Sequence, residues 1–256
     1  PTPPFFFLMI RRPQRATLVR SSAASDVYKR QQLNPDNGQI KEYSTGTLTS
    51  GTYQIIADSD GNIWTIQFRA DRLIKISPSD NMISEYKIPS SNTFAETLTS
   101  DKYGNIWFIE RDTHTLGFFN SSRPEPIQVV FDIKNFQVNK HSDSTTTMQV
   151  KSDQQAFFLA RGNMRVTGIL DNFDVTFSPS RMEKTDSFSD IQINMDSHRA
   201  LENGIYYLTI GASTMDLAYY KGTFIEINVI DSFSDPVFLT GIILSIVSAV
   251  VIWRKK

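Results

Sequence analysis

A repeat of 43 residues constrains this chain more than any other feature of its sequence. Residues 58–64 read DSDGNIW, and residues 101–107 read DKYGNIW. The same offset holds outside these stretches, where Pro35, Ile40, Glu42, Tyr43 and Leu73 return as Pro78, Ile83, Glu85, Tyr86 and Leu116. A period of about 40–50 residues built from short strands is typical of the blades of a β-propeller.

The turn inside the repeat could be read as a calcium loop or as a hairpin turn. A calcium loop needs several oxygen ligands at set positions, but Asp60 of the first copy is replaced by Tyr103 in the second. Glycine and asparagine, which tolerate positive φ in a tight turn, are kept. We therefore predict a hairpin turn followed by a strand with a core tryptophan. The repeated structural positions are Gly61, Asn62 and Trp64 in the first copy, and Gly104, Asn105 and Trp107 in the second.

The chain is predicted to be all-β up to its C-terminal segment. Residues 32–126 hold both repeats, and each repeat is expected to form one blade of four antiparallel strands, beginning with its Ile-x-Glu-Tyr strand. This gives a partial β-propeller of about two blades. Residues 127–232 alternate apolar and polar side chains between turn signals, with no long helical period. About seven strands in roughly 100 residues predict a β-sandwich.

Two stretches of the second region carry a resemblance of their own. Residues 173–180, FDVTFSPS, and residues 204–210, GIYYLTI, resemble the middle and late strands of immunoglobulin-like modules on prokaryotic surface proteins. The resemblance implies that the sandwich over 127–232 is immunoglobulin-like.

The first 31 residues do not read as a folded element. Their short apolar run has no basic flank before it, unlike a signal peptide. The string resembles a translated sequencing-adapter artefact; the alternative is a disordered basic tail. In either case we expect residues 1–31 to lie outside the fold, and the native chain to begin upstream.

The last segment predicts a membrane anchor. Residues 236–253, PVFLTGIILSIVSAVVIW, hold 18 residues without a charge, and the basic residues 254–256 follow at once. A helix of this length spans about 27 Å, close to the hydrocarbon thickness of a bilayer. A core helix is the alternative, but an all-β neighbourhood offers it nowhere to pack. We predict a transmembrane helix with residues 254–256 as a cytoplasmic basic tail and both β domains outside the cell.

Charge and cysteine content exclude several function classes. Residues 1–31 carry six basic and one acidic group and the last three residues add three positive charges, so residues 32–253 have a net charge of −9. A body this acidic is a poor candidate for binding nucleic acid. The chain has no cysteine, which excludes disulfides and thiolate metal sites.

The repeat motifs resemble those of the streptogramin lyase (virginiamycin B lyase) family over about 95 residues. That family runs Gly-Asn-Ile-Trp-Phe-Thr-Glu, then Ile-Gly-Arg-Ile, then Ile-x-Glu-Tyr. Here residues 104–110 read GNIWFIE and residues 116–119 read LGFF, while the first copy is looser. The resemblance implies propeller blades, and it raises the possibility of a carbon–oxygen lyase that uses histidines, a glutamate and magnesium.

The residues needed for that lyase chemistry are missing from both repeats. The family places a histidine ten or eleven positions before the blade tryptophan. This chain has Gln54 or Tyr53 there in the first repeat, and Thr97 or Glu96 in the second. Glu110 stands where the family carries a glutamate, and it is the one weak catalytic candidate. A carboxylate of ordinary pKa is a poor substitute for an imidazole base.

The three histidines of the chain do not supply the missing base. His114, His141 and His198 fall in expected loops, and none has metal-ligand spacing to another histidine. No metal or cofactor site is evident, with magnesium expected only if the lyase resemblance extends to activity. Residues 120–122 form a glycosylation sequon that suits an outside loop.

Three functions remain open at this point. The first is a membrane-anchored extracellular binding or scaffolding protein, single-pass in the cell membrane, with an unknown extracellular ligand or protein as partner and no nucleic acid. The second is a lyase-type enzyme whose catalytic blades are missing from this fragment. The third is a structural envelope protein.

Overall fold

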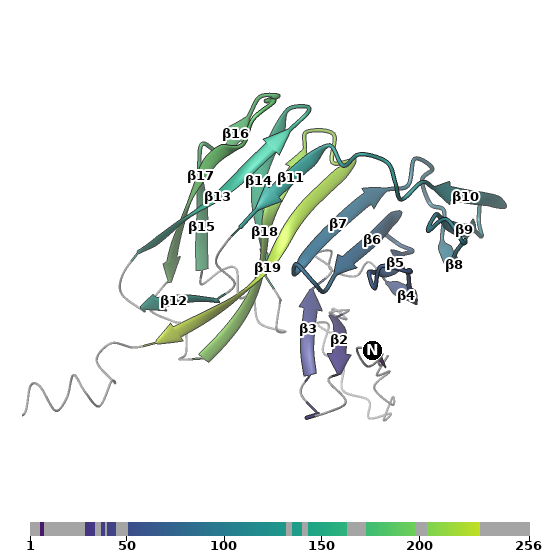
Figure 1. Cartoon of the computed structure of the whole chain (residues 1–256), viewed down its shortest axis with the longest axis horizontal. Helices are drawn as coiled ribbons and strands as arrows, with labels where there is room; N and C mark the ends of the chain where they lie inside the picture. The colour runs from purple at the N-terminus through teal and green to yellow at the C-terminus, as the bar shows by residue number, and fades with distance from the viewer. Residues whose placement is uncertain are drawn as a thin grey trace, which may run out of the picture.

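The described part of the chain consists of strands and turns. The computed structural model describes residues 6–7, 29–33, 37–38, 40–44, 51–131, 135–139, 143–162, 173–197 and 204–230. Within these ranges there is no helix, and the strands form several largely antiparallel sheets, which confirms the all-β prediction (Figure 1). The predicted transmembrane segment 236–253, His141 and His198 lie outside the described residues. None of the described residues belongs to a helix that is long and apolar enough to cross a membrane.

The 43-residue period is reproduced strand by strand. The first repeat supplies β4 (Thr52–Ala57), β5 (Ile63–Gln67) and β6 (Arg72–Ser77). The second repeat supplies β8 (Ala95–Ser100), β9 (Ile106–Glu110) and β10 (Thr115–Phe119). Each triplet is an antiparallel meander, and the first strand of each carries a register shift at the same place, between Thr52 and Ile55 and between Ala95 and Thr97.

The boundaries of the blades are shifted by one strand relative to the boundaries of the sequence repeat. We predicted that the strand over residues 40–44 would begin the first blade. Instead β3 (Ile40–Ser44) pairs with β2 (Lys29–Leu33), which pairs with β1 (Phe6–Phe7). The prediction that residues 1–31 lie outside the fold is therefore wrong for β1 and for the part of β2 within that range, since both belong to this sheet. The fourth strand of the first blade is β7 (Met82–Lys87), which carries the Ile-x-Glu-Tyr of the second repeat. A short β6–β7 hairpin forms it, with Asn81 at positive φ.

The second blade differs from the four-stranded prediction, because it has three strands. The strand expected next, β11 (Ile127–Val130), pairs with a strand of the following region instead. The sequence gives a physical reason. Pro124 and Pro126 stand where the first repeat has Asn81 and Ile83. Proline has no N–H to donate to a sheet, and Ile83 lies within the β6–β7 ladder.

The second region is built from two sheets on one core. One sheet has the order β11, β13 (Ser144–Ser152), β17 (Ser189–Ser197), β15 (Phe173–Ser178). The other includes β16 (Arg181–Met182), β14 (Ala156–Gly162), β18 (Gly204–Thr214) and β19 (Tyr219–Ile230), with β12 (Asn135–Asn139) parallel to β19. Their facing side chains form one buried cluster, which includes Met148, Ile191, Ile193, Ile210 and Ile227. The immunoglobulin-like assignment of this region stays a prediction.

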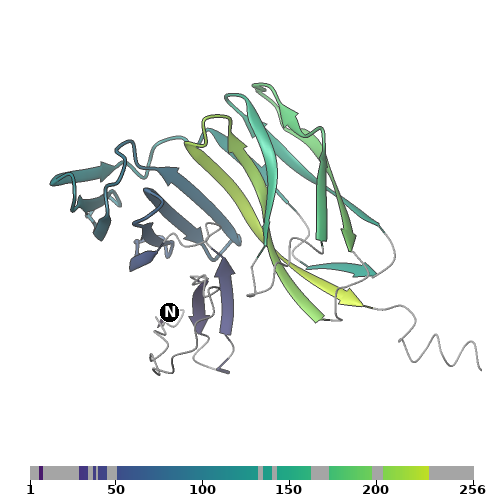
Figure 2. The same cartoon turned by 180° about the vertical axis from the view of Figure 1, so that it is seen from behind.

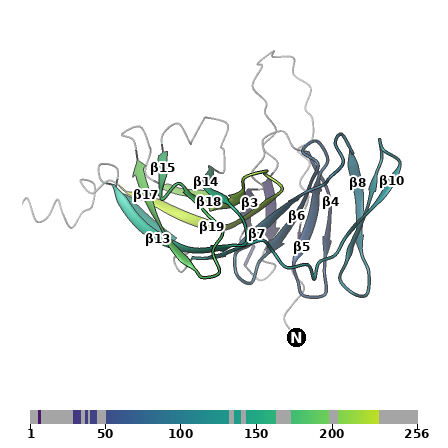
Figure 3. The ribbon, with the colours of Figure 1, turned by 90° about the horizontal axis from the view of Figure 1, so that it is seen from above.

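One strand joins the two regions. β19 pairs antiparallel with β7, from Tyr219 opposite Tyr86 to Thr223 opposite Met82. The first blade therefore continues into the second region as a single nine-stranded sheet. Figure 2 shows the same junction from behind, with the yellow-green strands next to the blue ones. In Figure 3 the blades and the second region lie side by side along this shared sheet.

A buried ion cluster occupies one face of the β7–β19 junction. Glu85 is fully buried, and Arg161 of β14 donates to its Oε1 at 2.6 Å. The guanidinium of Arg161 also lies 4.0 Å over the ring of Tyr220. Arg72 approaches the other oxygen of Glu85 at 3.8 Å. Burial lowers the pKa of Arg161, but the charge of Glu85, the nearby Tyr220 and the hydrogen bond to Glu85 together outweigh burial, so the pKa is raised.

A second polar network lies on the opposite face of the junction. Lys221 donates to Glu125 at 2.8 Å and to Ser84 at 3.0 Å, and the Tyr86 hydroxyl donates to Glu125 at 2.9 Å. Burial raises the pKa of the Glu125 carboxyl, but Lys221 and these hydrogen bonds hold it below its usual value. Burial and the Glu125 charge raise the pKa of Tyr86 far above its usual value. Polar groups on both faces thus fix how the blade meets the second region.

Candidate functional site

The repeated Asp-Gly-Asn turn is a closed hydrogen-bond cluster. Oδ1 of Asp58 accepts from the backbone N–H of Asp60 at 3.0 Å and of Asn62 at 2.9 Å. Oδ2 accepts from the Asn62 amide at 3.0 Å and from the indole N–H of Trp64 at 2.8 Å. Gly61 has a φ of 80°, which a side chain would strain.

The second copy repeats this cluster around Asp101. Its carboxylate accepts from the backbone of Tyr103 and Asn105, from the Asn105 amide at 3.0 Å, and from Trp107 Nε1 at 3.1 Å. The hydrogen bond from Asn105 is the main reason that the pKa of Asp101 is lowered to about 2. In both copies the carboxylate is fully engaged in holding the turn and the tryptophan. This supports the hairpin-turn interpretation over the calcium loop.

Glu110 lies at the end of β9, where it is buried and holds its own loop. Its side chain is 4% exposed, and Oε2 accepts from the Thr113 hydroxyl at 2.7 Å. Gln67 occupies the same place in the first repeat and is buried as well. His114 is exposed in the following turn, with a φ of 55°. In the described part of the chain, no three His, Cys, Asp or Glu side chains are placed to hold a metal ion.

Of the positions where the lyase family carries histidine, Gln54 serves the packing of the blades. Gln54 accepts the backbone N–H of Leu98 through Oε1 at 2.9 Å, which ties the first blade to the second. Thr97 is exposed, and Glu96 pairs with Arg111. The side chain of Tyr53 lies outside the described residues. Among the described side chains, none of these positions therefore supplies a base beside Glu110.

One structural residue, in the turn between β5 and β6, was not predicted from the sequence. Asp71, at a φ of 49°, accepts from the backbone of Asn92 at 2.8 Å and from Thr93 through its N–H at 2.9 Å and its hydroxyl at 2.7 Å. It thereby fastens the turn of the first blade to the loop that enters the second. No motif of the repeat marks it, because the second repeat has His114 there.

The two blades pack face to face. The first blade contributes Trp64, Ile66 and Leu73, which are 0–1% exposed. The second blade covers them with Leu98 and Phe108, together with Ala95, Ile106 and the partly buried Phe119. Trp64 lies 5.6 Å from Phe119 and 6.1 Å from Tyr86, measured between ring centroids.

The opposite side of the second blade is an exposed apolar surface, which we call the outer blade face. It is formed by alternate residues of three paired strands: Thr97, Thr99, Trp107, Ile109, Leu116 and Phe118. Ile109 is 53% exposed, Leu116 62% and Phe118 52%. Ile109 and Leu116 are the repeat equivalents of Ile66 and Leu73, which the second blade buries completely. The same residue types are thus buried in one blade and exposed in the other.

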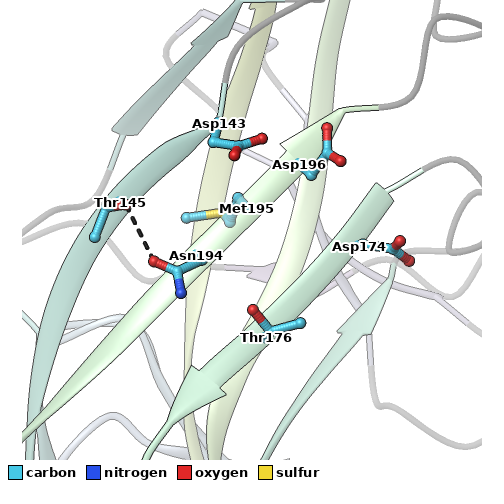
Figure 4. A pocket seen from close by; sticks show the side chains of 7 residues that line it. All are labelled: Asp143, Thr145, Asp174, Thr176, Asn194, Met195 and Asp196. Carbon is cyan, nitrogen blue, oxygen red and sulfur yellow. Dashed lines mark hydrogen bonds between the residues drawn. The ribbon is translucent and has the colours of Figure 1, made fainter.

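A shallow hollow of about 500 Å³ lies on the second region, on the strands β13, β15 and β17. Asp143, Asp174 and Asp196 surround it, and Thr145 donates to Asn194 across it at 3.1 Å (Figure 4). Its three acidic side chains do not converge on one point in Figure 4. Of the two surfaces, the outer blade face is the more specific candidate, because its equivalent in the same molecule is a packing interface.

Comparisons with known proteins give similarity only at the level of solved structures. No family model matches the chain, and no curated protein matches it. It is similar to selenomethionine-substituted virginiamycin B lyase from Staphylococcus aureus, at 15% identity and a TM-score of 0.33 over 81% of this chain and 65% of that one. It is similar to a streptogramin B lyase structure at 17% identity and a TM-score of 0.32 over 80% and 67% of the two chains. The sialic acid-binding region of a Streptococcus sanguinis SK1 adhesin aligns at 7% identity and a TM-score of 0.32 over 80% and 73%.

The chain spans less than two thirds of the length of the Staphylococcus aureus lyase. At TM-scores this low, none of these similarities assigns the chain an activity.

Proposed function

We propose that this chain is a membrane-anchored extracellular binding or scaffolding protein, and that the outer blade face is the surface that contacts its protein partner. One observation carries the proposal. Ile109, Leu116 and Phe118 are each more than half exposed, whereas Ile66 and Leu73, the equivalents of the first two, are buried against a packed sheet. Contiguous exposed apolar surface on a β-sheet is the usual mark of a protein–protein contact.

The rest of the molecule is built so that it can support that surface rigidly. β19 of the second region pairs with β7 of the first blade, and the buried Glu85–Arg161 pair links the two regions at this junction. A partner bound at the outer blade face is therefore held at a set position relative to the second region. This is the physical requirement for a scaffold.

The anchor and the location are part of the same proposal. Residues 236–253 would cross the cell membrane once, with residues 254–256 in the cytoplasm and both β regions outside. Protease treatment of intact cells should remove the β regions and leave the C-terminal tail protected. Recovery of the full-length chain from the soluble fraction would contradict the anchor.

Site-specific photo-crosslinking tests the binding surface. The full chain carries a benzoylphenylalanine at position 109, on the outer blade face, and is irradiated in the cells that naturally produce it. We expect a discrete adduct with another polypeptide. The matched control places the same group at Val130, which is 42% exposed on β11, and should give none. The absence of adducts at 109, or equal adducts at both positions, would contradict a partner at this face.

A further inference from the structure

Several strands of the described residues end a sheet, and the sequences of two of them fit one another. β10 is the last strand of the order β10-β9-β8, and β3 is the last of the order β1-β2-β3. In the first blade the equivalent of β10 is β6, and β7 occupies the corresponding edge. The second blade is therefore one strand short at β10. Open strand edges of this kind add further strands readily.

The chain contains a spare strand of the type that is missing. β7 carries Ile83-Ser84-Glu85-Tyr86, and β3 carries Ile40-Lys41-Glu42-Tyr43 at the 43-residue offset. β3 thus has the sequence of an outer blade strand, but no blade strand pairs with it among the described residues; its one partner there is β2.

We propose that β3 of a second copy of this chain adds antiparallel to β10 and completes the second blade. The register follows from the β6–β7 pairs, in which Leu73 is opposite Tyr86 and Lys75 is opposite Ser84. Moved by one repeat at each strand, these pairs become Leu116 opposite Tyr43 and Phe118 opposite Lys41. Backbone hydrogen bonds supply the attraction, as in other cases where a strand is added to a sheet edge.

The arrangement of the chain favours a second copy over the same one. In Figures 1 and 3, β3 and β10 lie on opposite sides of the strands β4–β6. Two copies that exchange β3 reciprocally form a closed two-fold pair, because each copy has one strand to give and one edge to fill. The inference concerns the edge of the blade and does not depend on what the outer blade face binds.

Cysteine crosslinking tests this pairing sharply, because the natural chain has no cysteine. Full chains carrying Lys41→Cys are mixed with full chains carrying Phe118→Cys and oxidised mildly. Directly opposite residues of antiparallel strands have Cβ atoms about 4.5–5.5 Å apart, within reach of a disulfide. We expect a product of twice the chain mass that disappears on reduction. Phe118 is 52% exposed, so its replacement should leave the fold intact, which circular dichroism checks.

The register control uses Leu116→Cys in place of Phe118→Cys. Its diagonal partner distance is about 7–8 Å, so we expect roughly tenfold less product. Equal yields with both partners, or no product with either, would overturn the proposal. A double variant, Lys41→Cys with Phe118→Cys, should also give the dimer. A disulfide within single monomers would instead assign the strand to its own chain. Each of these negative results leaves the crosslinking at position 109 unaffected.

Discussion

The two blades share three equivalent strands and the same turn, but equivalent side chains are buried in the first blade and largely exposed in the second. In the first blade Trp64 and Leu73 are 1% exposed, because the second blade covers them. In the second blade Leu116 is 62% exposed and Trp107 is only partly buried. The first blade also has a fourth strand and continues into the second region, whereas the second blade ends at β10. The comparison shows that a repeat determines strands and turns, while its neighbours determine what those strands contribute to stability.

The tryptophan pair should show the largest contrast. Trp64→Ala removes a fully buried indole and leaves Asp58 without one of its donors, so we expect the free energy of unfolding to fall by about 3–5 kcal/mol. Trp107→Ala should cost about 1–2 kcal/mol, because its ring is partly exposed beside Phe118. Urea denaturation followed by circular dichroism measures both. Equal losses would mean that a partner sheet covers the second blade in solution.

Substitutions in the two polar clusters test the β7–β19 junction, which only the first blade makes with the second region. Glu85→Ala leaves Arg161 charged, buried and without its carboxylate, which should cost about 3–5 kcal/mol. The matched change on the other face, Glu125→Ala, should cost less, about 1–2 kcal/mol, because that carboxylate is 25% exposed. The same denaturation experiment compares them. If both changes cost about the same, the junction does not depend on the buried pair.

The leucine pair isolates the outer blade face. Leu73→Ala should lower the free energy of unfolding by about 2–5 kcal/mol through a cavity between the blades. Leu116→Ala should change it by less than about 0.5 kcal/mol, because the side chain is mostly in solvent. Thermal unfolding of both variants checks this. A loss above about 1 kcal/mol for Leu116→Ala would show that the face is covered in the isolated protein.

Much of the blade architecture could be predicted from the sequence, because it depends on local chemistry. The turns at Gly61 and Gly104 and the tryptophans after them occur where the repeat places them. The predicted boundary between the blades was wrong by one strand, since the Ile-x-Glu-Tyr strand can pair with the strand before it or the strand after it. Pro124 and Pro126 are the sequence signal that the second blade lacks this strand.

The candidate site was less accessible from the sequence. Glu110 was foreseen at the end of its strand, but its burial and its bond to Thr113 depend on loop geometry that no motif encodes. The exposure of the outer blade face could not be predicted from the sequence, because Leu73 and Leu116 are the same residue type at the same repeat position. Which of them is buried depends on the order of the sheets in space. The pairing of β7 with β19 was also missed, since no short-range pattern links strands so far apart.

A smaller effect concerns the turn of the second blade. The pKa of Asp101 is about 2, chiefly because Asn105 donates to it. Asn105→Ala should raise this pKa toward the usual value of an aspartate, near 4. Because the folded-state pKa is lowered, the stabilisation is complete above about pH 4 and is lost as the pH falls through about 2. NMR titration of the Asp101 carboxyl measures the shift. An unchanged pKa in the variant would show that another donor holds the carboxylate.

The last prediction is the absence of an effect. This chain should not linearise a streptogramin-type cyclic depsipeptide, with or without magnesium, because Glu110 is buried against Thr113 with no histidine at the family position. Chromatography of the substrate after incubation with the full chain measures this. Turnover that is lost in Glu110→Gln would show that one carboxylate suffices.

The shared strand β19 has a consequence for how this protein is made. Thr223, which bonds to the backbone of Asn81, lies 142 residues later in the chain. A ribosome adds about 5–20 residues per second, so the edge of β7 waits on the order of ten seconds for its partner. During that time the edge of β7 is unpaired and exposed to water, and Glu85 lacks its ion-pair partner Arg161. Translation speed and early chaperone contact should therefore influence the yield of folded chain more than they do for a protein whose strands pair with near neighbours.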